Sequence, residues 1–586
     1  MMNITIDNIP VEVEEKTTLM DACRQQGIKI PSLCSMKDIS HNASCAICVV
    51  EVKGARSLAR ACVTQVREGM EIITNNPRIQ EARRVNIELL LANHPADCFY
   101  CERNQNCELQ KISLDLGISD KRFARIRPEK KMIDDSSPSI IRDAEKCILC
   151  GRCVAVCREM QTVNAIDFYG RGTYSHIGTF LESGLGNVAC MNCGQCALVC
   201  PTGAITEKSH VNEVWKALND PLKMVVVQTA PAIRVGIGEA MSMPAGSLVT
   251  GKMAAGLRRL GFDKVFDTQF AADLTIIEEG NELLQRIKNG GTLPMITSCS
   301  PGWIKFIEHF YPMLLGHLST CKSPQQMFGA IAKTYYAEKN NINPRKMVVV
   351  SVMPCTAKKF EARRPEMNAA FEYWKGSMLL RNSDNFPDVD YAITTRELAR
   401  MFKEAGIDFA NLKEEDFDHP LGTSTGAGTI FGATGGVMEA ALRTAYELYT
   451  GRPLPRLEFE AVRGMDGIKS ADVDLDGTKI KVAVAHTLKN ARQLLAQIER
   501  GQSPYAFIEV MTCPGGCLGG GGQPIPSTLE SRMKRAESLY IEDLYKGIRK
   551  SHENPDILNL YTDFLDKPLG ELSHHLLHTH YIPRGY

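Results

Sequence analysis

The chain has 586 residues, of which 44% are hydrophobic, and carries 68 basic and 68 acidic side chains. This length suits three or four domains with at least one large core. The balanced charge gives no reason to expect nucleic acid as a partner. No apolar run approaches the roughly 20 residues that cross a membrane. The first residues, Met1–Asp7, alternate like a strand and do not resemble a signal peptide, so we expect a cytoplasmic protein without membrane contact.

Twenty-one cysteines are many for a cytoplasmic chain. Disulfides are disfavoured in that compartment, so clustered cysteines indicate metal or redox sites. Sixteen of them precede residue 201 and five follow it. The sequence therefore predicts a metal-rich front and a back of different character.

Residues 1–79 open with two predicted strands, Ile4–Ile6 and Val11–Val13, and a helix over Leu19–Gln26. Four cysteines then keep the C-x₂-C core of the plant-type [2Fe–2S] ferredoxins, although the gap before this core is longer. We expect them to bind a [2Fe–2S] cluster, and a zinc site is the alternative; they are Cys34, Cys45, Cys48 and Cys62. Cys23 lies outside this pattern and is expected in the core.

Residues 80–127 place one histidine and three cysteines within a short segment: His94, Cys98, Cys101 and Cys107. The spacing alone would also fit a zinc knuckle. Its position after a [2Fe–2S] domain favours iron, because similar His-Cys₃ segments in multi-cluster proteins hold a [4Fe–4S] cluster. A histidine ligand in place of a cysteine changes the cluster charge and so tunes its potential.

Residues 128–209 contain the C-x₂-C-x₂-C-x₃-C pattern twice, as in bacterial ferredoxins with two [4Fe–4S] clusters. In that pattern the fourth cysteine of each run binds the other cluster. One predicted cluster has the ligands Cys147, Cys150, Cys153 and Cys200, and the other has Cys157, Cys190, Cys193 and Cys196. The front third is thus a string of clusters suited to moving electrons.

Residues 210–586 change character and predict an α/β sheet with buried strands alternating with helices. The strands are expected at Met224–Gln228, Met347–Val352, Ile480–Ala485 and Ala506–Met511, and helices at Ala254–Leu260 and Arg396–Ala405.

Two other segments of this region could be interpreted as ligand-binding sites. Gly426–Gly436 precedes an apolar helix that starts near Val437, but it is not GxGxxG and lacks a phosphate-loop lysine, so we interpret it as close backbone packing. The tail has four histidines in Ser573–Tyr581; an exposed helix end is favoured over a metal site.

Residues 509–524 read EVMTCPGGCLGGGGQP. Cys513 and Cys517 are four apart, so on one helical turn their sulfurs would face the same way. The apolar lead-in predicts a buried strand end, and the glycines let a bulky group lie against bare backbone. Two thiolates in such a pocket indicate a buried metal cofactor; a surface turn with two incidental cysteines is the alternative.

Three segments together resemble the signature motifs of the [FeFe]-hydrogenases, TSCCPxW, MPCxxKxxE and ExMxCxxGCxxGG. They are Thr297–Trp303 (TSCSPGW), Met353–Glu361 (MPCTAKKFE) and residues 509–524. The whole chain resembles the large clostridial type. This implies an α+β multidomain protein with ferredoxin-like iron–sulfur domains at 1–79, 80–127 and 128–209, and an α/β domain holding the H-cluster at 210–586.

The resemblance implies an H-cluster, a [4Fe–4S] cubane joined to a diiron unit with CO, cyanide and a bridging dithiolate. Cys355, Cys513 and Cys517 would ligate the cubane, and Cys517 would bridge to the diiron unit. Lys358 and Gln325 would face its small ligands. Met353 and Met511 would form apolar walls.

The reaction implied is 2H⁺ + 2e⁻ ⇌ H₂, which requires a proton route into a buried site. The resemblance assigns this relay to Cys299, Glu279, Ser319, Glu282 and Arg286. From the residues alone, two glutamates three apart on a helix would be interpreted as a solvated face.

The first motif departs from the family at one position, where Ser300 replaces the cysteine that would ligate the cubane. Ser300 could ligate through oxygen, a harder donor than iron–sulfur iron prefers. Cys299 could instead ligate and leave the relay, or the cubane could be absent. Ala232 is a milder departure, where some relatives carry serine near the diiron unit. Cys321 is expected in the core.

Several functions remain open at this point. The chain could be a hydrogenase that works with ferredoxin, or the hydrogen-converting subunit of an NAD(P)-linked complex whose flavin and nucleotide sites lie on partner subunits. A sensor of H₂ or an electron-transfer protein of the same fold is the alternative, because of the TSCSP motif. A complex I-like iron–sulfur subunit would explain only residues 1–209. The resemblance also implies maturation proteins that assemble the cofactor.

Overall fold

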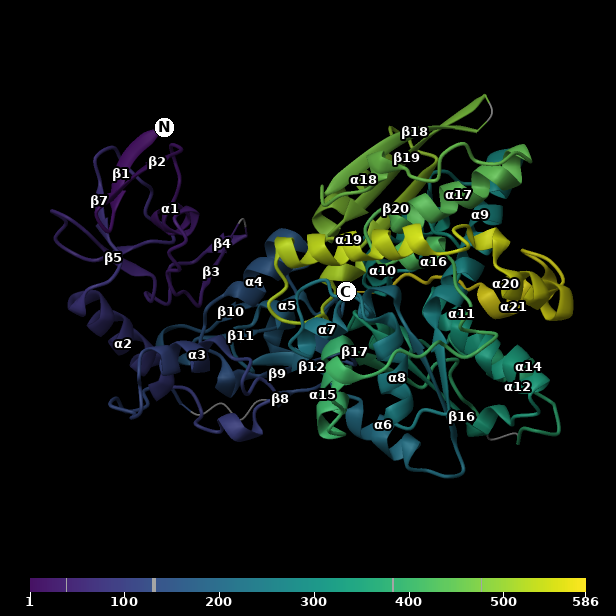
Figure 1. Cartoon of the computed structure of the whole chain (residues 1–586), viewed down its shortest axis with the longest axis horizontal. Helices are drawn as coiled ribbons and strands as arrows, with labels where there is room; N and C mark the ends of the chain where they lie inside the picture. Colours follow the sequence, from purple (N-terminus) through teal and green to yellow (C-terminus); the bar gives the residue numbers. More distant parts are fainter. Residues whose placement is uncertain (38, 129–132, 382–383, 476, 586) are drawn as a thin grey trace. The chain divides into compact units, whose positions relative to one another are not determined.

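The computed structural model describes residues 1–37, 39–128, 133–381, 384–475 and 477–585 (Figure 1). The chain forms two compact units. The first contains residues 1–188 and 199–206, and the second contains residues 189–198 and 207–586. No helix in the described part of the chain is both long and apolar enough to span a membrane.

The first unit begins with a small sheet of strand order β2-β1-β7-β5-β6. Its strands are β1 (Met2–Ile6), β2 (Ile9–Val13), β7 (Glu71–Ile73), β5 (Val49–Val52) and β6 (Ala59–Arg60). Alternate residues of β1 and β2 are buried, as period-two patterning requires, and α1 (Leu19–Gln25) packs on them with its N-terminus capped by Thr18. These elements confirm the predicted strands and helix.

Further helices and small sheets complete this unit. Helix α2 (Pro77–Ala92) starts at a proline with Asn76 as its cap, and α3 (Glu108–Asp115) starts directly after Cys107. The strands β8 (Ile133–Asp134), β9 (Ile140–Asp143) and β12 (Ile205–Glu207) form one sheet, and β10 (Asp167–Tyr169) pairs with β11 (His176–Gly178).

The second unit is built on two four-stranded sheets. One has the order β14-β13-β16-β17 and is parallel throughout, with β14 (Lys264–Asp267), β13 (Met224–Thr229), β16 (Met347–Met353) and β17 (Tyr391–Thr394). The other has the order β15-β20-β19-β18, in which only β18 is antiparallel, with β15 (Met295–Ile296), β20 (Phe507–Met511), β19 (Thr478–His486) and β18 (Ile468–Leu475).

Valine-rich strands are buried on both faces here because helices cover them. The 22-residue α9 (Thr268–Asn289) contacts α11 (Pro324–Ile331) and α17 (Gly436–Thr450), and α19 (Leu529–Tyr545) packs against α16 (Gly426–Ile430), as Figure 1 shows. Helices α8 (Thr250–Arg259) and α15 (Thr395–Glu404) confirm the two predicted helices. The α+β multidomain fold is confirmed.

One prediction for this region is only partly right. His574 and His575 on α21 (Glu571–Leu577) and His580 after it are exposed, as predicted, but His578 is 5% exposed. Strand-like pairing holds the tail in place: the amide of Thr579 donates to the carbonyl of Thr320 and that of Lys322 donates to Leu577, both at 2.8 Å.

Candidate active site

A cavity lies where strands of both sheets in the second unit end. The segments that follow β13, β15, β16 and β20 at their carboxyl ends all contribute to its wall. Carboxyl ends of parallel strands are the usual place for ligand sites in α/β sheets. The wall therefore collects all three motif segments, although they are separated by up to about 200 residues in the chain. Its lining includes Ala230, Pro231, Cys299, Ser300, Gln325, Met353, Cys355, Lys358, Met511, Cys513 and Cys517.

Cys513 and Cys517 reach this cavity from a tight turn. The single helical turn considered from their spacing is not what forms: Gly515 and Gly516 have φ of +76° and +77°, and a short 3₁₀ turn begins at Cys517. Gly520 lets this loop touch the Cys355 loop, because a Cβ there would lie 2.2 Å from the carbonyl oxygen of Pro354. The glycines thus bring the two cysteine loops together.

Burial raises the pKa of the Cys355, Cys513 and Cys517 thiols, the last to about 12. Binding to iron would require loss of the thiol protons, because the thiolate is the ligand form. None of the three is in a disulfide. Three soft donors in one apolar cavity fit an iron–sulfur cubane.

Ser300 stands at the same cavity wall and is already hydrogen-bonded. Its Oγ lies 2.8 Å from Oγ1 of Thr512 and accepts from the Thr512 amide at 3.3 Å. It precedes α10 (Pro301–Phe310) but makes no capping hydrogen bond. The hydroxyl is thus held at the base of the loop that carries Cys513.

Lys358 and Gln325 form a polar corner of the cavity. Nζ of Lys358 donates to Oε2 of Glu361 at 2.8 Å and to the carbonyl of Cys299 at 3.2 Å. Nε2 of Gln325 donates to the same Glu361 oxygen at 3.1 Å, while its buried Oε1 has no partner among the described residues. Glu361, which carried no assigned role from sequence, orients both groups. Its fixed spacing from Lys358 in the second motif was the signal for it.

Met353 and Met511 line the cavity as expected, whereas Ala232 does not. Ala232 is fully buried behind the wall, where a Cβ on Gly432 would lie 3.3 Å from its own Cβ. The two flexible thioethers can pack against a cofactor of irregular shape, and the apolar walls exclude water from it.

Glu279 on α9 is buried, 1% exposed, and both carboxylate oxygens lack a hydrogen-bond partner among the described residues. Burial, and then the charge of Glu282, raise its pKa to about 8. Burial and then the proximity of Glu279 raise the pKa of Cys299. The solvated face considered for these glutamates is wrong, because both faces of α9 are covered.

Glu282 continues from Glu279 toward the surface. Its carboxylate accepts from Oγ of Ser319 at 2.9 Å and from Nη2 of Arg286 at 2.6 Å. Arg286 also donates to the carbonyl of Leu318 at 2.7 Å, and its side chain is 14% exposed. Hydrogen bonds thus link Ser319 through Glu282 to a partly exposed guanidinium, and Glu279 lies close enough to Glu282 and Cys299 for their charges to interact.

Two of the predicted cysteine sets of the first unit lie close together. Sγ of Cys34 lies 3.4 Å from that of Cys45, and the sulfurs of Cys48 and Cys62 are equally close. One cavity is lined by all four of Cys147, Cys150, Cys153 and Cys200. The buried Nδ1 of His94 has no hydrogen-bond partner among the described residues. Sγ of Cys101 packs tightly against Gly203, where a Cβ would lie 2.6 Å from the sulfur.

The segment with Cys190, Cys193 and Cys196 belongs to the second unit and packs on the cavity loops. Nε2 of Gln195 donates to the carbonyl of Gly519 at 2.9 Å, and Oγ1 of Thr356 donates to that of Asn192 at 2.7 Å. The charge of Cys193 contributes to the raised pKa of Cys513, after burial and Cys355. A cluster on this segment would lie next to the cavity.

The Gly-rich segment at 426–436 packs as expected. A Cβ on Gly436 would lie 1.7 Å from the carbonyl oxygen of Ile430. The amides of Gly435 and Met438 at the start of α17 both donate to the carboxylate of Glu509 at 2.7 Å, so an internal anion occupies the position that a phosphate would take. Cys23 and Cys321 are fully buried, as expected for core residues.

Comparison with known families covers nearly the whole chain. A model described as the C-terminal domain of the iron only hydrogenase large subunit matches residues 223–521, and one described as the iron hydrogenase small subunit matches 529–584. A 2Fe-2S iron-sulfur cluster binding domain matches residues 1–77. An NADH-ubiquinone oxidoreductase-G iron-sulfur binding region matches 83–122, and a ferredoxin-like domain of NADH-quinone oxidoreductase subunit 3 matches 137–206.

Individual relatives agree with these matches. The chain is 51% identical to the NADP-reducing hydrogenase subunit HndD of Solidesulfovibrio fructosivorans, over 100% of this chain and 99% of that protein. It is 41% identical to iron hydrogenase 1 of Clostridium pasteurianum, over 99% and 100%. A solved structure of apo [FeFe]-hydrogenase HydA1 from Chlamydomonas reinhardtii matches with a TM-score of 0.57 and 45% identity, covering 65% of this chain and 100% of that one.

The fold, the cysteine clusters and the cavity together define an iron–sulfur oxidoreductase, in which ferredoxin-like domains precede an α/β domain. The matches over the whole length of the chain also show its family. The chain belongs to the iron-only, or [FeFe], hydrogenases, enzymes that act on H₂.

Proposed function

We propose that this chain catalyses the reversible reaction 2H⁺ + 2e⁻ ⇌ H₂ at an H-cluster held in the cavity of the second unit. The observation that carries the proposal is the convergence of Cys355, Cys513 and Cys517 on one apolar cavity, which is also lined by Cys299, the inner member of the proposed relay. The H-cluster would supply the metal-centred redox chemistry, and the surrounding residues would position it and exchange its protons.

Lys358 would direct its ammonium toward the anionic cyanide side of the cofactor. Its three N–H donors are only partly used by Glu361 and the Cys299 carbonyl. Gln325 would add its amide at the same corner, and Met353 and Met511 would exclude water. A charge-assisted hydrogen bond in such an environment is stronger than a neutral one.

Ser300 would fill the fourth ligand position of the cubane through oxygen. Its hydroxyl is fixed next to the Cys513 loop by Thr512. Cys299 would remain in the proton relay, because Ser300 would take the ligand position and the Cys299 thiol lies close to Glu279, as well as to Lys358 and Cys517. This assignment keeps both functions that the family places on two adjacent cysteines.

Protons would pass from Arg286 and Glu282 through Ser319 to Glu279 and Cys299. Glu279 is suited to this because a pKa of about 8 lets it both hold and release a proton near neutral pH. Ser319 is bound to Glu282 and fully buried, so its hydroxyl can bridge the two carboxyls.

Electrons would enter through one [2Fe–2S] and three [4Fe–4S] clusters in the domains 1–79, 80–127 and 128–209. Ligands would be the four-cysteine sets and His94 with Cys98, Cys101 and Cys107. The cluster that includes Cys190, Cys193 and Cys196 would be the last donor, because its segment contacts the cavity loops through Gln195 and Thr356.

A relative named as an NADP-reducing hydrogenase subunit, at 51% identity over the full length, supports a similar role in an NAD(P)-linked complex. Partner subunits would bind the nucleotide and flavin, with ferredoxin as a second electron partner. Maturation proteins would deliver the diiron unit. Reconstitution with such subunits should yield NADPH-dependent H₂ formation; activity with reduced ferredoxin alone would instead place the chain among the ferredoxin-linked enzymes.

Replacement of Glu282 by glutamine tests the relay. We expect H₂ evolution with reduced methyl viologen to fall by about 10²–10⁴-fold, the usual contribution of a positioned acid–base group. Iron and sulfide content should stay the same. A near-normal rate would remove Glu282 from the proposed route. Loss of iron–sulfur content would show that the variant reports on assembly instead.

A further inference from the structure

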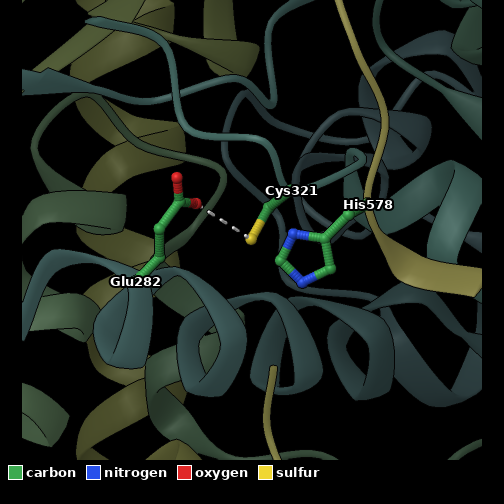
Figure 2. A group of neighbouring side chains, drawn as sticks. All are labelled: Glu282, Cys321 and His578. Carbon is green, nitrogen blue, oxygen red and sulfur yellow. Dashed lines mark hydrogen bonds between the residues drawn. The ribbon is translucent and has the colours of Figure 1, made fainter. Parts of the chain in front are cut away.

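Beside the proposed relay lies a buried cluster that no motif predicts. Figure 2 shows Glu282 on α9, Cys321 and His578 with their side chains directed toward one another. One ligand atom from each lies within 4.8 Å of the others, and all three residues are buried. Sγ of Cys321 lies 3.8 Å from Oε2 of Glu282. The histidine comes from the segment that matches the small-subunit family model.

His578 is held by a second carboxylate. Its Nε2 lies 3.1 Å from Oε2 of Glu278, which also accepts from the Leu569 amide at 2.9 Å and from the hydroxyls of Tyr561 and Ser573. Glu278 is fully buried, and these donors keep its pKa low although burial alone would raise it. An ionised Glu278 fixes the tautomer in which His578 carries its proton on Nε2.

This leaves Nδ1 of His578 as the basic nitrogen of the cluster. It lies 2.8 Å from Oγ1 of Thr320, whose amide in turn donates to Glu282. Nδ1 is also the nitrogen that faces Cys321 in Figure 2. Imidazole and thiol therefore lie next to each other, with Sγ of Cys321 within 4.8 Å of a ring nitrogen of His578 and hydrogen-bonded to the carboxylate of the relay.

A metal ion is a poor occupant of the cluster. Glu282 already forms an ion pair with Arg286 at 2.6 Å. A divalent cation would have to displace this partner or lie beside a guanidinium. The donors present are instead those that move protons.

We propose that Cys321 and His578, oriented by Glu278, form a proton-holding side branch of the relay at Glu282. When Glu282 is protonated, its proton passes to the Cys321 sulfur as the thiol proton moves to Nδ1 of His578, and the Thr320 hydroxyl turns away from Nδ1 to become an acceptor. The result is an ionised Glu282, an unchanged thiol and an imidazolium beside ionised Glu278. The reverse transfer returns the proton, and no oxidant or reductant is involved.

The surroundings of His578 allow this exchange. The titratable groups that face it are Glu278 and Glu282 on α9, Cys321, Tyr561, and His574, whose exposed ring stacks on it at 4.6 Å between centroids. Tyr581 closes the cluster by donating to the carbonyls of Ser319 and Cys321. Two carboxylates stabilise the imidazolium, and the tail that carries it covers the relay.

The branch supplies protons to the relay at high pH, where few are available from solvent. Its removal should therefore change how the rate of H₂ evolution depends on pH. Cys321→Ala cuts the branch, whereas Cys321→Ser keeps a hydroxyl that can relay. We expect Cys321→Ala and His578→Gln to match the wild type in H₂ evolution at pH 6 and to be at least about threefold slower at pH 8.5. Cys321→Ser should retain most of the wild-type rate. His575→Gln, an exposed histidine on the same helix, is the matched control.

Infrared spectroscopy gives a second test of the branch, which does not depend on catalytic turnover. The S–H stretching band of Cys321, obtained as the infrared difference between wild type and Cys321→Ala, should shift in Glu282→Gln, because the acceptor of the thiol changes. Rate ratios constant across pH, an equally slow Cys321→Ser, or an unshifted band would overturn the branch.

The branch rests on the proposed relay, and the two can fail separately. A normal rate for Glu282→Gln would refute the relay itself. A slow Glu282→Gln together with normal pH profiles for Cys321→Ala and His578→Gln would refute the branch alone.

Discussion

Replacing Glu279 by glutamine tests the physical basis of the proton route most sharply. The side chain is buried without a hydrogen-bond partner among the described residues, and its pKa lies at about 8 in place of 4.5. That difference corresponds to about 5 kcal/mol against ionisation. At pH 7 the group is then about nine-tenths protonated, whereas an ordinary glutamate would be almost fully ionised. The carboxyl is thus a loaded proton donor.

Infrared spectroscopy can observe this proton directly. The difference spectrum between wild type and Glu279→Gln should contain the carbonyl stretch of a protonated carboxyl at pH 7, and the band should disappear as pH rises, with a midpoint near 8. H₂ evolution by the variant should fall by about 10²–10⁴-fold. Exposed Glu499→Gln is the control and should lack such a band. Absence of the band at pH 7 would refute the assignment.

The same shift has a consequence for stability. A carboxyl whose pKa is raised on folding retains its proton in the native state, so stability falls as pH rises from about 4.5 to about 8 and is unaffected below that window. Glutamine at position 279 removes this dependence. Between pH 5 and pH 8 the variant should gain up to about 3 kcal/mol relative to wild type. Parallel melting temperatures across this range would contradict the reasoning.

Two further changes test the cavity and its support. Ser300→Cys supplies the softer ligand, so loss of the cubane iron to a chelator should be slower by on the order of tenfold; equal rates would show that Ser300 is not a ligand. Glu509→Gln places an amide against the amides of Gly435 and Met438, and should lower the free energy of unfolding by about 1–3 kcal/mol. An unchanged melting temperature would contradict the role given to that carboxylate.

Local patterns in the sequence predicted much of this molecule. The segment 347–353 is almost entirely apolar, a pattern typical of a strand that is buried on both faces. The repeated cysteine spacing of 147–157 and 190–200 indicates ferredoxin-like clusters. The motif cysteines were identified by resemblance, and the structure adds the reason they meet: all follow strands at the same end of two sheets.

The parts that escaped prediction depend on contacts between distant residues. From the residues alone, Glu279 and Glu282 were interpreted as a solvated face, because a sequence cannot show that a helix is covered on both sides. His578 was predicted to be exposed, because its partner Glu278 is 300 residues away in the chain. The turn at Gly515 and Gly516 could not be told from a helical turn, since four-residue spacing suits both.

The central claim is that the cavity assembles an H-cluster despite Ser300. An infrared spectrum of protein matured anaerobically with the diiron cofactor tests it most directly. We predict bands of metal-bound CO and cyanide, which are absent from Cys517→Ser treated in the same way. A spectrum without these bands, from protein rich in iron and sulfide, would contradict the account and favour an electron-transfer or H₂-sensing role.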